Sequence, residues 1–196
     1  MTVEFRGVDN LVYAEVLKDD EGGYEAAEPK LLAPTAEISK SVEQGSATKY
    51  YDNKPALVIA STGADTVTFT VSVLGLETLA EITGQFYDPD TGAMAEGEAE
   101  PRYFAVGYRL KKTDGSYRYV WRLKGRFAQP EESSATEDAG TDSKNQSLVY
   151  TGVSTEHRFA KGGARKSVMV DEGDGKADLE GFFSEVQTLL TIKPAT

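Results

Sequence analysis

The sequence contains 196 residues, 39% of them hydrophobic, and its 21 basic and 32 acidic residues give a formal net charge of −11. This length fits one domain, and so acidic a surface disfavours phosphate binding to nucleic acid as the main activity. The absence of cysteine from the sequence excludes disulfides, thiolate metal sites and thiol nucleophiles. Neither a secretory signal nor a bilayer-spanning apolar run is visible, which predicts a protein made in the cytoplasm without membrane insertion.

The first third of the chain is predicted to contain an arm, two strands and a loop. Residues 1–10 are polar with scattered apolar positions, which indicates an N-terminal arm. Apolar-rich stretches predict strands over 11–17 and 31–39. The polar stretch 41–54, which holds the Asp52-Asn53 turn signal, is predicted to be a loop.

The clearest strand is residues 66–73, TVTFTVSV, in which apolar and hydroxyl side chains alternate strictly. The hydroxyl face consists of Thr66, Thr68, Thr70 and Ser72. It carries no charge, which admits two interpretations. Threonine simply suits exposed strands, or the face lines a channel or contacts a neighbouring molecule.

A short helix is predicted over residues 76–82, with Gly84 as its C-terminal cap. After a turn-rich connection, residues 103–111 and 116–127 flank an Asp-Gly pair and predict a long hairpin. One face of its second strand is aromatic and apolar. The opposite face is basic and consists of Arg118, Arg122, Lys124 and Arg126.

The stretch 129–147 contains no strong apolar residue and is predicted to be a long polar loop. Its acidic residues are Glu131, Glu132, Glu137, Asp138 and Asp142. The basic face of the hairpin therefore has three possible roles: a solvated surface, a polyanion site, or a surface that pairs with this acidic loop on another copy. We favour the third, because opposite charges on one chain support head-to-tail contacts.

The C-terminal part is predicted to contain strands over 148–159 and 167–170, separated by a Gly162-Gly163 turn. Asp178 then precedes an apolar stripe with helical spacing, which predicts an amphipathic C-terminal helix packed on the sheet. The stripe consists of Leu179, Phe182, Phe183, Val186 and Leu190.

No motif for catalysis or metal binding emerges. The one histidine, His157, cannot supply a ligand set or a triad by itself. The acidic stretches 88–92 and 171–180 resemble calcium loops, but the second has glycine where oxygen ligands are needed and the first fails similarly. A pair of glycosidase-type carboxylates stays open as a possibility, although nothing marks two of them.

Read in order, the chain resembles the major tail proteins of long-tailed, non-contractile bacteriophages and prophages of Gram-positive hosts. The resemblance runs nearly end to end and is carried by four segments. These are residues 4–20 (EFRGVDNLVYAEVLKDD), 50–84 (YYDNKPALVIASTGADTVTFTVSVLGLETLAEITG), 103–127 (YFAVGYRLKKTDGSYRYVWRLKGRF) and 170–183 (VDEGDGKADLEGFF).

The resemblance implies a mainly β fold, a β-sandwich or partial barrel with a flanking helix, in a single domain over residues 1–196. It implies a tail tube subunit in the virion tail that forms stacked hexameric rings in the host cytoplasm during assembly. The implied partners are further copies, a tape-measure protein, a tail terminator and tail-tip proteins. Phage DNA would pass through without specific binding, and neither catalysis nor a cofactor is implied.

Three alternatives remain open at this point. One is a carbohydrate-binding β-sandwich that uses surface aromatics such as Tyr50, Tyr51, Tyr87 or Tyr103. Another is an enzyme with an unmarked carboxylate pair. The third is a tube subunit of a related DNA-free injection device or tail-like bacteriocin.

Overall fold

The computed structural model describes the backbone of residues 2–51, 54–130 and 145–195, and the side chains of the same residues except 44–62. Over these residues the fold is mainly β, as predicted, with a nine-stranded antiparallel sheet, a two-stranded sheet and one short α-helix. The elements are β1 (Phe5–Asp20), β2 (Gly23–Ala26), β3 (Lys30–Leu31), β4 (Thr35–Tyr51), β5 (Lys54–Val71), α1 (Leu76–Thr83), β6 (Phe86–Asp88), β7 (Ala93–Ala95), β8 (Phe104–Lys112), β9 (Tyr117–Phe127), β10 (Gln146–Gly152), β11 (Ser167–Asp171) and a 3-10 turn (Glu172–Asp174).

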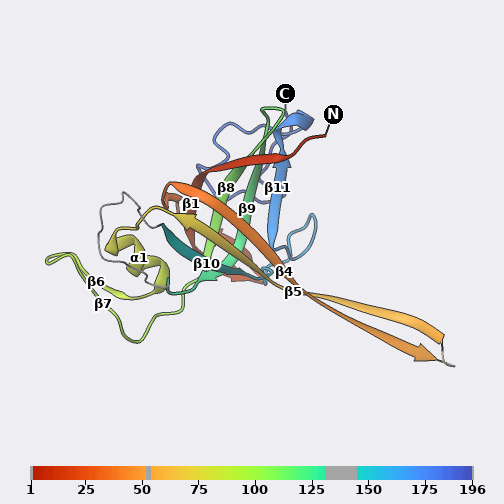
Figure 1. The fold of residues 1–196 in the computed structure, drawn as a ribbon, viewed down its shortest axis with the longest axis horizontal. Coiled ribbons are helices and arrows are strands. Elements are labelled where there is room, and N and C mark those ends of the chain that lie inside the picture. The colour runs from red at the N-terminus through yellow and green to blue at the C-terminus, as the bar shows by residue number, and fades with distance from the viewer. Residues whose placement is uncertain (1, 52–53, 131–144, 196) are drawn as a thin grey trace, which may run out of the picture.

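The large sheet curls back towards itself (Figure 1). Its strand order is β2-β1-β8-β9-β10-β5-β4, with β11 added to β9 and β3 added to β1. The chain passes from Leu31, which is paired with β1, to Thr35, which begins β4 at the other end of the order. Four residues span at most about 14 Å, so the two ends of the sheet lie close together. Within the described residues, β2 and β4 do not pair, and the sheet stays open.

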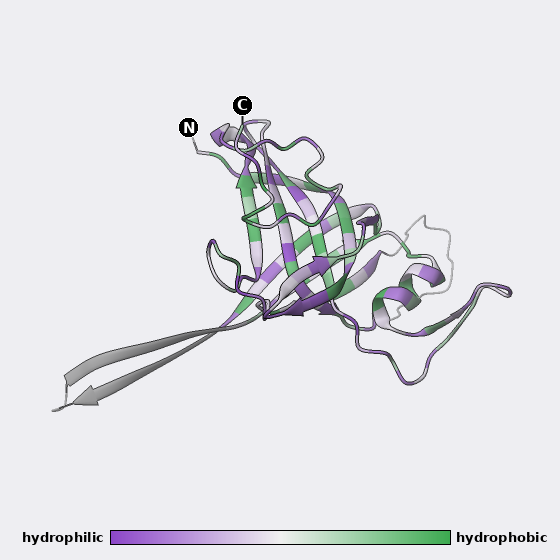
Figure 2. Ribbon diagram, turned by 180° about the vertical axis from the view of Figure 1, so that it is seen from behind, coloured by the Kyte–Doolittle hydropathy of each residue, from purple (hydrophilic) through white to green (hydrophobic). Residues whose placement is uncertain are grey.

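Hydrophobic and hydrophilic residues alternate along several strands (Figure 2), and the side chains on the two faces of the sheet form two buried clusters. The larger cluster includes Phe69, Phe104 and Tyr150, and helix α1 adds Leu79 and Ile82 to it. The smaller cluster includes Val12 on β1, Ala105 on β8, and Trp121 and Leu123 on β9, and the C-terminal segment packs on it. Trp121 is its fully buried centre, and its indole N–H donates to the carbonyl of Phe182 at 3.0 Å.

The most prominent feature is a hairpin arm formed by the outer halves of β4 and β5. Beyond the sheet the two strands stay paired, from the pair of Gln44 with Thr62 to the pair of Tyr51 with Lys54. This hairpin, called the arm below, extends well away from the rest of the molecule (Figure 1). The prediction of a loop over 41–54 is therefore wrong: the backbone is paired on both sides of the turn signal, and residues 52–53 lie outside the described residues. Polar residues form a strand here because the backbone N–H and C=O groups of β4 pair with those of β5, whatever the side chains are.

Two predicted boundaries also differ. Strand β1 begins at Phe5 and pairs with β8 from that residue on, so most of the predicted N-terminal arm is strand. Strand β10 ends at Gly152, which leaves His157 in a loop, although a strand was predicted up to residue 159. Both boundaries depend on where a partner strand pairs with the segment. The periodicity of the segment's own sequence does not contain this information.

The prediction of a C-terminal helix is also wrong. Residues 178–192 form successive turns, and Gly181 has a left-handed φ of 66°, which ends helical propagation. The apolar stripe is nevertheless used for packing. Phe182 is buried and Phe183, Val186 and Leu189 pack on the Trp121 cluster, whereas Leu190 is 55% exposed.

Two local predictions are confirmed. Helix α1 ends at Gly84, whose φ is 72° and whose N–H donates to the carbonyl of Ala80. Strands β8 and β9 form the predicted hairpin around Gly115, which has a φ of 91°. In the described part of the chain, no helix has the length and apolar character needed to cross a membrane.

Candidate functional site

The hydroxyl face predicted on residues 66–73 lies on the outer side of β5. Val67, Phe69 and Val71 are fully buried on the inner side, whereas Thr66, Thr68 and Thr70 are partly exposed on the other. The strand ends at Val71, so the expected alternation stops there. Ser72 and Val73 lie beyond β5, and both are exposed.

Neighbouring strands extend this face in a way that one strand cannot reveal. Thr66 pairs with Thr151 on β10 and with Ser41 on β4, and residues opposite each other share a face. Thr68 pairs with Ser39 and Val149, and Thr70 pairs with Ser147 and Glu37. The result, called the hydroxyl face below, consists of Ser39, Ser41, Thr66, Thr68, Thr70, Ser147 and Thr151. By the same pairing, Val149, Glu37 and Arg126 lie beside it on the same side of the sheet. The members on β4 and β10 were not predicted, although Ser147 and Thr151 flank the buried Leu148 and Tyr150 on β10.

A buried ionic cluster lies where the arm leaves the sheet. The carboxylate of Asp65 accepts a hydrogen bond from Arg122 at 2.9 Å and lies 3.2 Å from both Lys40 and Lys166. Lys166 also donates to the carbonyl of Gly63. Burial alone would raise the pKa of Asp65, but the hydrogen bonds from Lys40 and Lys166 hold this pKa below its ordinary value. The cluster therefore ties the base of the arm to β9 and to the segment before β11.

A second buried pair fixes the β1–β2 turn. Lys124 lies 2.7 Å from the carboxylate of Asp19, and both side chains are buried. Asp19 also accepts the backbone N–H groups of Glu156 and His157 at 2.9 and 2.8 Å. Burial opposes ionisation of Asp19, but the hydrogen bond from Lys124 outweighs it and lowers the pKa of this carboxyl. His157 is thus held in a loop against β1 and β2.

The basic residues predicted to form one intersubunit face have different surroundings. Arg122 and Lys124 are 2% and 5% exposed and are paired within the chain, which makes them unsuitable for a contact with another copy. Arg118 donates a bidentate pair of hydrogen bonds to the carboxylate of Asp171 at 2.8 and 2.6 Å, and these bonds lower the pKa of Asp171 to about 2. Only Arg126 of the four is classed as exposed. The acidic residues predicted as partners, Glu131, Glu132, Glu137, Asp138 and Asp142, lie outside the described residues.

Of the four tyrosines suggested for carbohydrate binding, the structure describes the side chains of two, Tyr87 and Tyr103. The ring of Tyr103 lies 4.7 Å from the Lys124 ammonium and 4.3 Å from the Arg126 guanidinium, so its π-system already contacts two cations. Tyr87 is partly exposed on β6, and the side chains of Tyr50 and Tyr51 fall in the arm, outside the described side chains.

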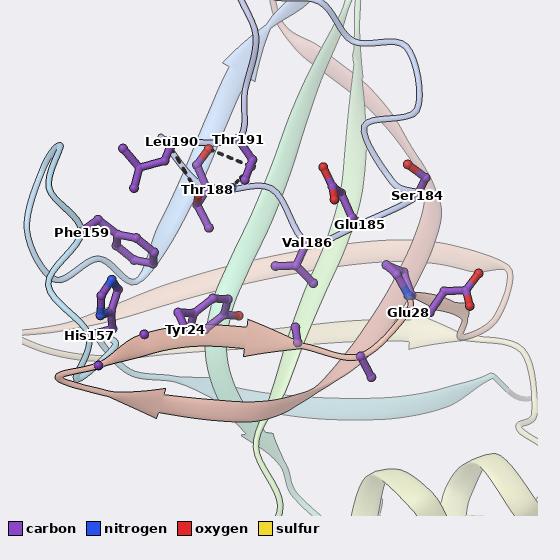
Figure 3. Close-up of a pocket in the computed structure, with 15 residues that line it drawn as sticks. Tyr24, Glu28, His157, Phe159, Ser184, Glu185, Val186, Thr188, Leu190 and Thr191 are labelled. Carbon is purple, nitrogen blue, oxygen red and sulfur yellow. Dashed lines mark hydrogen bonds between the residues drawn. The ribbon is translucent and has the colours of Figure 1, made fainter.

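A groove of about 630 Å³ runs between β2 and the C-terminal segment (Figure 3). Tyr24 and Phe159 meet edge to face at one end, and His157 contacts Phe159 in the same manner, with ring centroids 4.9 Å apart. Glu28 and Glu185 lie towards the other end (Figure 3). The groove therefore combines an aromatic end with an acidic end beside a strand.

Within residues 2–51, 54–130 and 145–195, no group of three or more histidine, aspartate or glutamate side chains is placed to hold a metal ion. The described geometry thus offers three surfaces: the arm, the hydroxyl face and the groove beside β2. No protein-family model matches the chain, and a search of curated proteins found no significant relative, so the assignment of function rests on these surfaces and on the sequence pattern.

Proposed function

We propose that this protein is a structural subunit that assembles with copies of itself into a tube, as the major tail proteins of long-tailed, non-contractile phages do. The observation that carries the proposal is the arm. It consists of two paired strands that leave the sheet and extend away from it (Figure 1). An isolated two-stranded hairpin is marginal in water and is stabilised by a partner surface.

The sequence of the arm supports a role in contact with another molecule. Its second strand contains the continuous apolar run Ala56–Ala60, in a stretch with no acidic residue between Lys54 and Thr62. Such a run is typical of a strand that is covered on both sides. A contact between the arm of one subunit and the body of the next would link copies head to tail, and would stack rings if the rings close.

The hydroxyl face supports the second half of the proposal, which is a conduit for DNA. Its hydroxyl side chains are short and neutral, and one acidic residue, Glu37, and one basic residue, Arg126, lie beside them. The net charge of −11 leaves little overall attraction for phosphates. A lumen lined in this way would let DNA slide, since strong phosphate contacts would hold it. We therefore assign the lumen lining to this face, within a tail-tube type of partial barrel. In such a tube, the subunits would form stacked hexameric rings. Their partners would be a tape-measure protein, a terminator and tail-tip proteins.

Electron microscopy tests the proposal directly. Purified protein is concentrated, incubated with and without tail-tip complexes as nucleators, and examined by negative stain beside a light-scattering mass. We expect rings or tubes with a central hole and a mass that increases with time. A chain that stays monomeric in the presence of nucleators would contradict the proposal and favour a binding module.

A further inference from the structure

We propose that the groove between β2 and the C-terminal segment receives the arm of a second copy of this chain. This inference rests on the proposed self-assembly and adds to it the place where the arm binds. It follows from three properties of the groove: an open strand edge, apolar side chains in its lining and two carboxylates.

The open edge belongs to β2, the last strand in the order of the large sheet. The N–H of Ala27 donates to Glu15 on β1, and alternate residues of a strand direct their backbone groups to opposite sides. The backbone groups of Ala26 therefore point away from β1, towards the side that is free in the described structure. Such an edge accepts a further strand by backbone hydrogen bonds.

The arm supplies strands with open edges. Strand β4 ends the sheet on its side, and β10 pairs with β5 only over Asp65–Val71, within the described residues. Beyond this point, and among the residues that the structure describes, the two strands of the arm pair only with each other. Eight residues per strand reach about 26 Å, which is long enough to reach a neighbouring molecule.

The chemistry of the groove fits the sequence of the arm. Its lining includes the apolar residues Pro29, Phe159 and Val186, which suit an apolar strand such as Ala56–Ala60. Its far end carries the carboxylates of Glu28 and Glu185, both exposed (Figure 3). Residues 44–62 contain two lysines, Lys49 and Lys54, and one acidic residue, so their net charge is 2 − 1 = +1 in a chain of −11. This charge is complementary to the two carboxylates of the groove.

Cysteine cross-linking tests the contact cleanly, because the natural sequence contains no cysteine. One preparation carries Leu190→Cys, at an exposed side chain in the groove, and the other carries Lys54→Cys, near the end of the arm. The two are mixed, allowed to assemble and oxidised. We expect a covalent dimer that needs both substitutions, and much less of it when Glu98→Cys replaces Leu190→Cys. Glu98 is exposed and lies outside the groove.

The outcomes separate this inference from the proposed function. Tubes that form normally while Leu190→Cys cross-links no more than Glu98→Cys would overturn the groove as the receptor and leave self-assembly standing. In that case the groove is free for a different partner. Absence of assembly by the unmodified protein with nucleators would overturn both.

Charge reversal gives an independent measurement. The double variant Glu28→Lys/Glu185→Lys should raise the concentration needed for assembly about tenfold, because attraction to the arm becomes repulsion. Glu21→Lys/Glu98→Lys makes the same change in net charge at exposed positions outside the groove and should assemble nearly as the parent does. Equal effects of the two double variants would contradict the inference.

Discussion

The carboxylate of Asp65 and the guanidinium of Arg122 meet at 2.9 Å, and the two residues are only 4% and 2% exposed. They connect β5 to β9 across the inside of the curled sheet, at the residue where the arm leaves the body. Lys40 and Lys166 approach the same carboxylate, so one acidic group neutralises part of the charge of three cations. A buried ionic contact thus joins β5, close to the base of the arm, to β9.

Replacement of Asp65 by asparagine should lower the free energy of unfolding by about 3–5 kcal/mol, because Arg122 would stay buried without a counter-ion. Urea denaturation followed by circular dichroism measures this change. Asp9→Asn is the matched control: Asp9 pairs with Arg109, but its side chain is 47% exposed, so the loss should stay below about 1 kcal/mol. Similar losses for both variants would show that burial of the Asp65 cluster is energetically unimportant.

Gly125 should tolerate no side chain. A Cβ there would overlap the ring of Tyr150 and lie 2.5 Å from the carbonyl oxygen of Thr151, and both neighbours belong to β10. We expect Gly125→Ala to cost about 1–3 kcal/mol in unfolding free energy. Gly75→Ala, at an extended position with no atom within 4 Å of the added Cβ, should change stability by less than about 1 kcal/mol. Thermal unfolding of both variants gives the comparison, and equal melting temperatures would contradict the packing described.

Stability should decrease in acid. Hydrogen bonds from Arg118 are the main reason that the pKa of Asp171 falls from 3.8 to about 2 in the folded state. A carboxyl with a depressed folded pKa contributes its stability above its ordinary pKa and loses it as the pH falls through the folded value. We therefore expect the free energy of unfolding to decrease between about pH 4 and pH 2, and less steeply in Asp171→Asn. Urea midpoints across this range measure both slopes, and parallel slopes would exclude Asp171 as a contributor.

Removal of the arm should separate folding from assembly. When residues 44–62 are replaced by an Asn-Gly turn, the body keeps both hydrophobic clusters, so the melting temperature should change little. The variant should stay monomeric in light scattering under conditions in which the parent forms tubes. Tubes of normal length from the shortened protein would rule out the arm as the linking element.

Bulky side chains on the hydroxyl face should obstruct the conduit. Thr68→Tyr and Thr70→Tyr replace partly exposed residues and should leave the fold and tube formation intact. In reconstituted phage, DNA delivery should fall with each substitution, since the added rings narrow the lumen. Normal delivery by the double variant would remove this face from the lumen, and a tube without DNA would point to an injection device of the DNA-free kind.

Local sequence was sufficient for several elements. Strict alternation in residues 66–71 predicted the buried and exposed faces of β5, because a strand with one covered side repeats every two residues. Helix α1 and the β8–β9 hairpin were predicted in the same way, since Gly84 and Gly115 adopt backbone conformations that glycine favours. The mainly β character of the fold followed from these elements.

The sequence alone thus determined which residues of β5 are buried, where α1 ends and where the β8–β9 hairpin turns. Only the tertiary structure decided where the charges and the C-terminal segment lie. Arg122 and Lys124 had the pattern of an exposed basic face, yet they find carboxylates 57 and 105 positions away in sequence, at Asp65 and Asp19. The C-terminal stripe had helical spacing, but Gly181 interrupts the helix and Trp121 provides the surface on which the segment packs. Periodicity reports which side of an element is covered, whereas the partner that covers it depends on contacts that only the folded chain brings together.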